Sequence, residues 1–110
     1  MKFTDGFWLM REGVRAHHAR EVRDVRVHGD RFTLYAPVRS VAHRGDTLNT
    51  PLVTVDCWSP APGVIGVRTT HLAGSVRRTP SFEVRGDTGP PPTVRRDDST
   101  IELSSAGLSL

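Results

Sequence analysis

The chain is poor in cysteine, lysine, aromatic residues and long apolar runs, and each shortage excludes a class of protein. Among 110 residues, Cys57 is the single cysteine, Lys2 is the single lysine, and aromatic residues make up 6%. One cysteine forms no internal disulfide and does not fit the usual structural zinc patterns. No apolar run approaches the roughly 20 residues of a membrane helix, and residues 1–10 lack the features of a signal peptide. We therefore expect a cytoplasmic protein with no membrane partner.

The basic residues are mixed with acidic ones and do not form a stripe. The formal net charge is +3, and arginines stand next to aspartates at 23–24 and at 95–98. A surface that binds the phosphate backbone of a nucleic acid needs concentrated basic residues interleaved with aromatic side chains. We expect no nucleic-acid partner.

Alternation of apolar and polar residues with a period of two predicts two β-hairpins. The first covers 25–37, with a Gly-Asp turn and an end at Pro37, which has no N–H to give to a sheet. The second covers 53–71, and its Pro- and Gly-rich segment 59–63 predicts the turn. On its first strand Val53, Val55 and Cys57 share one face, and Trp58 lies on the other.

The remaining segments complete an all-β pattern. Residues 14–26 fit a helix or a strand, and the hairpin that follows favours the strand. Residues 72–100 predict mostly loop, with short strands at 81–84 and from Val94. Alternation returns in 100–110 around a Ser-Ser-Ala-Gly turn. The length and the pattern predict one domain, an antiparallel β-sandwich.

Local motifs predict no catalytic residue, metal or cofactor in this chain. Cys57 lies on an apolar strand face without the positioned histidine or helix N-terminus that activates a thiol, so packing is favoured. No histidine pair has the i, i+4 spacing of metal ligands, and no nucleophile elbow occurs. The two Arg-Gly-Asp tripeptides, at 44–46 and 85–87, predict ordinary turns.

Two segments carry a family resemblance. Residues 1–19 contain Met-Lys-x-Thr-Asp-Gly-x-Trp-Leu and then Gly-Val, and residues 43–74 contain Thr-Leu-x-x-Pro, Ser-Pro, Val-Ile-x-Val-Arg and His-x-x-Gly. The matching residues are Asp5, Gly6, Trp8, Leu9, Gly13, Val14, Thr47, Leu48, Pro51, Ser59, Pro60, Val64, Ile65, Val67, Arg68, His71 and Gly74. In these positions the chain resembles bacterial α-xylosidases of glycoside hydrolase family 31.

The resemblance implies that residues 1–110 are the first part of a galactose-mutarotase-like N-terminal β-sandwich, with the catalytic barrel downstream and absent from this chain. It implies a parent that is a retaining α-glycosidase, which hydrolyses terminal α-xylosides or related α-glycosides with two aspartates of its barrel. No catalytic residue is carried over onto this segment. The segment is expected to be inactive alone, to pack on the barrel and to shape the entrance of its sugar site.

Asp5 and Trp8, in the matched N-terminal segment, are the expected contact with the barrel. The alternative function is an independent carbohydrate-binding module, in which Trp8, Tyr35 and Trp58 stack on a sugar. A purely structural interaction module is a third possibility. Because a sandwich cut within a sheet exposes unpaired strand edges, we also expect a homo-oligomer.

Overall fold

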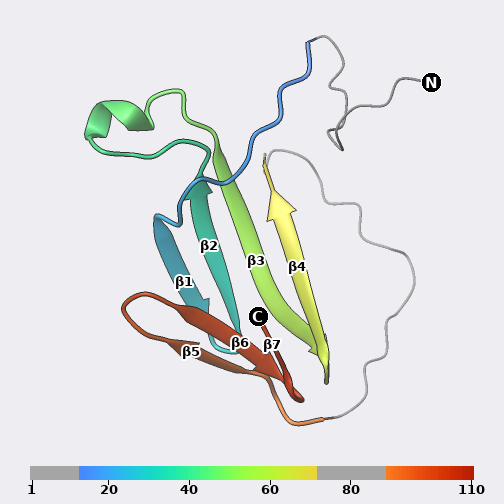
Figure 1. Ribbon diagram of the computed structural model, residues 1–110. Coiled ribbons are helices and arrows are strands. Elements are labelled where there is room, and N and C mark those ends of the chain that lie inside the picture. Colours follow the sequence, from blue (N-terminus) through green and yellow to red (C-terminus); the bar gives the residue numbers. More distant parts are fainter. Residues whose placement is uncertain (1–12, 72–88) are drawn as a thin grey trace, which may run out of the picture.

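The computed structural model describes residues 13–71 and 89–110, which form two antiparallel sheets. The first sheet has the order β1-β2-β3-β4 and the second has the order β5-β6-β7 (Figure 1). The elements are β1 Asp24–His28, β2 Arg31–Pro37, the 3-10 helix η1 Arg44–Thr47, β3 Leu52–Ala61, β4 Val64–Thr70, β5 Thr93–Arg96, β6 Ile101–Ser105 and β7 Leu108–Ser109. The expected all-β, sandwich-like architecture is confirmed.

The segment before β1 forms no helix. Residues 14–23 have no regular secondary structure, and the backbone N–H groups of Arg20 and Arg23 donate to the carbonyls of Pro37 and Tyr35 on β2. The preference for a strand over a helix is therefore correct, although the strand begins only at Asp24. The expected strand at 81–84 lies outside the described residues.

The second hairpin forms as expected, but its first strand is longer than the prolines predict. β3 continues through Pro60 to Ala61, so the turn contains only residues 62–63 and not the whole of 59–63. The register shifts between Trp58 and Ala61. Such a bulge tolerates a proline inside a strand, because a residue without an N–H then interrupts no regular ladder bond.

The C-terminal hairpin has a tighter turn than the Ser-Ser-Ala-Gly stretch suggests. Its turn consists of Ala106 and Gly107, with φ of 45° and 85°, the left-handed conformation that a type I′ two-residue hairpin requires at both positions. Ser104 and Ser105 are strand residues of β6, paired with Ser109 and Leu108 of β7.

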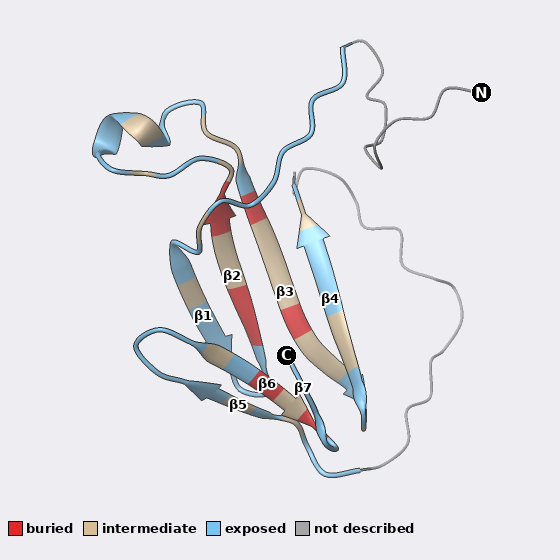
Figure 2. Cartoon of the chain, in the orientation of Figure 1, coloured by how far each residue is buried: buried red, intermediate tan, exposed pale blue. Residues whose placement is uncertain are grey.

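The core lies where the two sheets meet. Phe32 of β2 and Cys57 of β3 are partners in the first sheet, and Leu103 of β6 packs against them from the second sheet. Leu103 is fully buried. Figure 2 shows the buried positions along β2, β3 and β6. The alternation predicted from the sequence thus places Cys57 on the inner face and Trp58 on the outer face.

A hydroxyl network joins the two sheets beside this core. The hydroxyls of Ser59 and Ser105 are 2.8 Å apart, and the Ser105 hydroxyl accepts a bond of 3.1 Å from the N–H of Gly63. The Ser59 hydroxyl donates to the Ala61 carbonyl at 2.8 Å. Because Ser105 is buried, its hydroxyl needs these partners. The network holds the β3–β4 turn against β6.

Leu103→Ala should destabilise the fold by about 3 kcal/mol, because it removes a fully buried side chain and leaves a cavity between the sheets. The free energy of unfolding from urea denaturation measures the loss. Leu108→Ala is the matched control, since that side chain is half exposed, and it should cost much less. Equal losses for the two variants would contradict this account of the core.

Candidate functional site

Tyr35 and Trp58 lie on the outer face of the first sheet. Tyr35 pairs with Thr54, and Trp58 stands four residues further along β3 on the same face. At about 3.4 Å per residue, the two positions are about 14 Å apart along the strand. Between them lies the pair of Thr33 and Asp56, in which the threonine hydroxyl donates to the carboxylate at 2.8 Å. The two rings share a face without forming one continuous stacking surface.

Each ring is accompanied by an arginine. The Cζ of Arg68 lies 5.1 Å from the centre of the Trp58 ring, and the Cζ of Arg26 lies 5.0 Å from that of Tyr35. The Trp58 ring also lies close over Gly66, where an added Cβ would be 2.7 Å from Cε2 of the indole. A sugar that stacks on the indole would compete with the guanidinium. The sugar-stacking role of Tyr35 and Trp58 stays a prediction, and Trp8 and Asp5 lie outside the described residues.

A hollow of about 350 Å³ adjoins Trp58 on the outer face. Its lining residues are Arg31, Asp56, Cys57, Trp58 and Arg68. Two guanidinium groups and one carboxylate can hydrogen-bond a polar ligand. Retaining glycoside hydrolysis needs a pair of carboxyl groups, and the described lining of this hollow offers one, Asp56.

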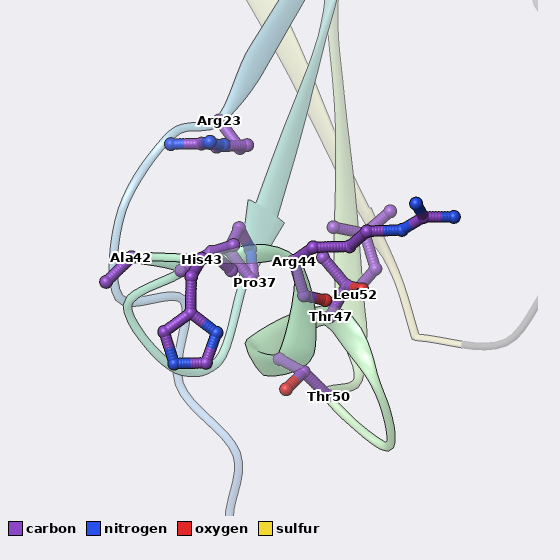
Figure 3. A pocket seen from close by; sticks show the side chains of 9 residues that line it. Arg23, Pro37, Ala42, His43, Arg44, Thr47, Thr50 and Leu52 are labelled. Atoms are coloured by element: carbon purple, nitrogen blue, oxygen red, sulfur yellow. Dashed lines mark hydrogen bonds between the residues drawn. The ribbon is translucent and has the colours of Figure 1, made fainter.

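A larger pocket, of about 530 Å³, lies where the loop between β2 and β3 folds back over the end of the first sheet (Figure 3). Its lining residues are Arg23, Pro37, Val41, Ala42, His43, Arg44, Thr47, Thr50 and Leu52. Figure 3 shows the Arg23 side chain on one side of this group and the Arg44 guanidinium directed away from His43. The lining residues that the structure describes are apolar, cationic or threonine, and none of them is a carboxylate.

A capping box shapes this loop. The Asp46 carboxylate accepts from the N–H groups of Ala42 and His43 at 2.9 and 3.0 Å, and Nδ1 of His43 accepts from the N–H of Gly45 at 3.1 Å. The first Arg-Gly-Asp tripeptide, expected to be a turn, is part of the 3-10 helix Arg44–Thr47. The three-residue spacing from His43 to Asp46 is the sequence signal for this box. The second tripeptide, 85–87, lies outside the described residues.

The Cys57 thiol is a core group. The side chain is buried against Phe32 and Leu103. Burial raises the pKa of the Cys57 thiol, and the charge of Asp56 raises it further. A thiol that stays protonated is a poor nucleophile, so the packing role expected for Cys57 is correct.

Two carboxylates near the C-terminal hairpin are held in the ionised form. The pKa of Asp97 is lowered to about 2, first by the Thr100 hydroxyl and then by the N–H groups of Ser99 and Thr100. The hydroxyls of Ser109 and Ser104 lower the pKa of Glu102. A general acid in glycoside hydrolysis needs a raised pKa, so these two carboxyl groups do not suit that role.

The histidines form no metal centre in the part of the chain that the structure describes. The rings of His17 and His71 stack with their centres 6.0 Å apart. Among residues 13–71 and 89–110, no group of three or more His, Cys, Asp or Glu side chains is arranged to hold a metal ion. No helix in these ranges has the length and apolar character to cross a membrane.

Two small antiparallel sheets around one core, with an outer face rich in arginine, define a sandwich-like β-domain. No family model matches the chain. Over all 110 residues it is 34% identical to an α-xylosidase of Emericella nidulans and 32% identical to the α-xylosidase XylQ of Lactiplantibacillus pentosus. The chain spans only 14% of the length of each. The expected resemblance is confirmed: this chain is homologous to the N-terminal region of α-xylosidases.

Gly66→Ala should displace the Trp58 ring, because the new Cβ would lie 2.7 Å from the indole. In a Trp8→Phe background, where Trp58 is the single tryptophan, we expect emission at longer wavelength and a loss of stability of about 1–2 kcal/mol. Thr70→Ala, on the same face of β4, is the control and should leave the emission in place. An unchanged spectrum for Gly66→Ala would contradict the close contact.

Asp97 should make the folding stability depend on pH at the acid end. Its folded pKa of about 2 lies below the unfolded value of about 3.9, so the ionised carboxylate stabilises the fold above about pH 4. This contribution is lost as the pH falls through about 2. Between pH 5 and pH 2, the difference in Tm between the wild type and Asp97→Asn should shrink. Asp98→Asn removes the same charge and is the control; a Tm difference for Asp97→Asn that stays constant with pH would refute the assignment.

Proposed function

We propose that this chain is a non-catalytic β-sandwich segment of a retaining α-glycosidase that hydrolyses terminal α-xylosides or related α-glycosides. The observation that carries the proposal is the similarity of all 110 residues to two α-xylosidases, of which the chain spans only 14%. Most of such an enzyme therefore lies outside the matched region.

The chemistry of the described carboxylates supports a non-catalytic role. A retaining glycosidase needs two facing carboxyl groups, one of which must carry a proton. Here Asp46 caps the 3-10 helix and Asp56 accepts from Thr33. Asp97 and Glu102 have lowered pKa values. These groups are engaged in holding the fold.

In the proposed role, the segment packs on the catalytic barrel in the cytoplasm and shapes the entrance of the sugar site. Asp5 and Trp8 are the proposed contact with the barrel, and carbohydrate is bound by the barrel. The alternative, an independent carbohydrate-binding module, is supported by the shared outer face of Tyr35 and Trp58. It is weakened by the arginines beside both rings.

The purified chain should not hydrolyse 4-nitrophenyl α-xyloside, because it carries neither carboxyl group of the catalytic pair. Release of 4-nitrophenol measures turnover, and the α-xylosidase of Emericella nidulans is the positive control. Titration with xylose oligosaccharides in the same buffer should leave the tryptophan fluorescence unchanged. Turnover that follows the chain through purification would refute the non-catalytic assignment, and saturable quenching would favour the binding module.

A further inference from the structure

The loop between β2 and β3, residues 38–51, is held in place by hydrogen bonds along its length and encloses the larger pocket. The N–H of Val41 donates to the Glu21 carboxylate at 3.0 Å. The Thr50 hydroxyl donates to the Asp46 carbonyl at 2.6 Å. Long loops with little secondary structure are usually either disordered or functional, and this one is ordered by its own bonds. The pocket behind it is therefore a preformed cavity, as binding sites commonly are.

The cavity offers an apolar surface of the size that a small ligand needs. Its volume is about 530 Å³, and ligand pockets have volumes of about 300–1,000 Å³. The apolar part of its lining consists of Pro37, Val41, Ala42 and Leu52. The Leu52 side chain, at the start of β3, is 45% exposed. An apolar body placed in the cavity would remove this surface from water, which favours binding.

Arg23 gives the cavity a positive charge. Its side chain lies on one side of the lining residues, whereas the Arg44 guanidinium is directed away from His43 (Figure 3). The ion pairs among the described residues leave Arg23 out and join Arg26 to Asp24, Arg31 to Asp30 and His43 to Asp46. A guanidinium can bind a carboxylate through two parallel hydrogen bonds. Arg23 is therefore the group that can hold an anion in this cavity.

The other polar groups of the loop are already used to hold it. The carboxylates of Glu21 and Asp46 accept from backbone N–H groups at 2.9 to 3.0 Å. The Thr47 and Thr50 hydroxyls donate to backbone carbonyls of the same loop, so toward a ligand they can act only as acceptors. A sugar carries a hydroxyl on most of its carbon atoms, and this lining would leave many of them without a partner. The cavity therefore favours a ligand with one anionic group and few hydroxyls.

We propose that this cavity binds a small monocarboxylate with an apolar body, whose carboxylate pairs with Arg23 and whose apolar part packs against Leu52 and its apolar neighbours. The site is separate from the hollow beside Trp58, which stands six residues further along β3, about 20 Å away. The ligand is a free organic acid and not a sugar. The proposal does not rest on the proposed function, because it concerns a cavity formed by this segment itself.

Titration of the isotope-labelled 110-residue chain with 2-naphthoate, followed by its amide signals in NMR spectra, tests the site. We expect saturable shifts at residues 41–50 and at Leu52. The neutral analogue 2-naphthylmethanol should bind about tenfold or more weakly, because it cannot pair with the guanidinium. Xylose at the same concentrations should leave these signals in place. Absence of saturable shifts with naphthoate, equal affinities for the acid and the alcohol, or saturation of the same signals by xylose would overturn the proposal.

Two substitutions separate the charged part of the site from the apolar part. Arg23→Gln should weaken naphthoate binding by about tenfold or more and leave the alcohol unchanged, because it removes only the guanidinium. The backbone N–H at this position keeps its bond to the Tyr35 carbonyl, so the fold is retained. Leu52→Gln should weaken the binding of both compounds, since it removes apolar contact and keeps Arg23.

Arg95→Gln is the matched control for the charge. It removes the same positive charge from an exposed position on β5, in the second sheet, and should leave both affinities unchanged. Equal effects of Arg23→Gln and Arg95→Gln on naphthoate binding would overturn the role of Arg23. Affinities of Leu52→Gln that match those of the wild type would overturn the placement of the apolar body.

Discussion

The contact of Leu103 with Phe32 and Cys57 holds the two sheets together. Each sheet alone would expose its inner face, and a small sheet with one uncovered apolar face has little independent stability. The hydrogen bond between the hydroxyls of Ser59 and Ser105 fixes the position of β6 relative to the β3–β4 turn. These two contacts together determine how the two sheets are placed.

The alternating pattern was sufficient to predict both long hairpins and the inner face of β3, because side-chain direction in a strand depends only on local periodicity. It was not sufficient at Pro60 and Ser105. Both positions look like turn residues in the sequence. Pro60 is accommodated by the irregular register between Trp58 and Ala61, and the Ser105 hydroxyl is bonded in the tertiary network that joins β3 to β6. The sequence contains no local signal for a contact between positions 46 residues apart.

The features of the candidate sites were likewise predictable from the sequence only in part. Burial of Cys57 followed from its place in an alternating strand. The stacking of Arg68 on Trp58 and of Arg26 on Tyr35 did not, because it depends on the strand register and on side-chain conformation. The three-residue spacing of His43 and Asp46 could have indicated the capping box, but histidine is an unusual residue at an N-cap. The similarity to α-xylosidases, and not the geometry of these side chains, indicates which kind of protein they belong to.

The distance along the chain between Cys57 and Leu103 has a consequence for synthesis. A ribosome that has completed the first sheet must still add the C-terminal hairpin before the core side chain of β6 is available. During that interval the inner face of β2 and β3 has no cover from the second sheet. Contacts of such long sequence separation also slow folding, because the intervening loop must close first. The nascent chain therefore depends on β6, which is made after the first sheet, to protect the inner face of β2 and β3 from premature association.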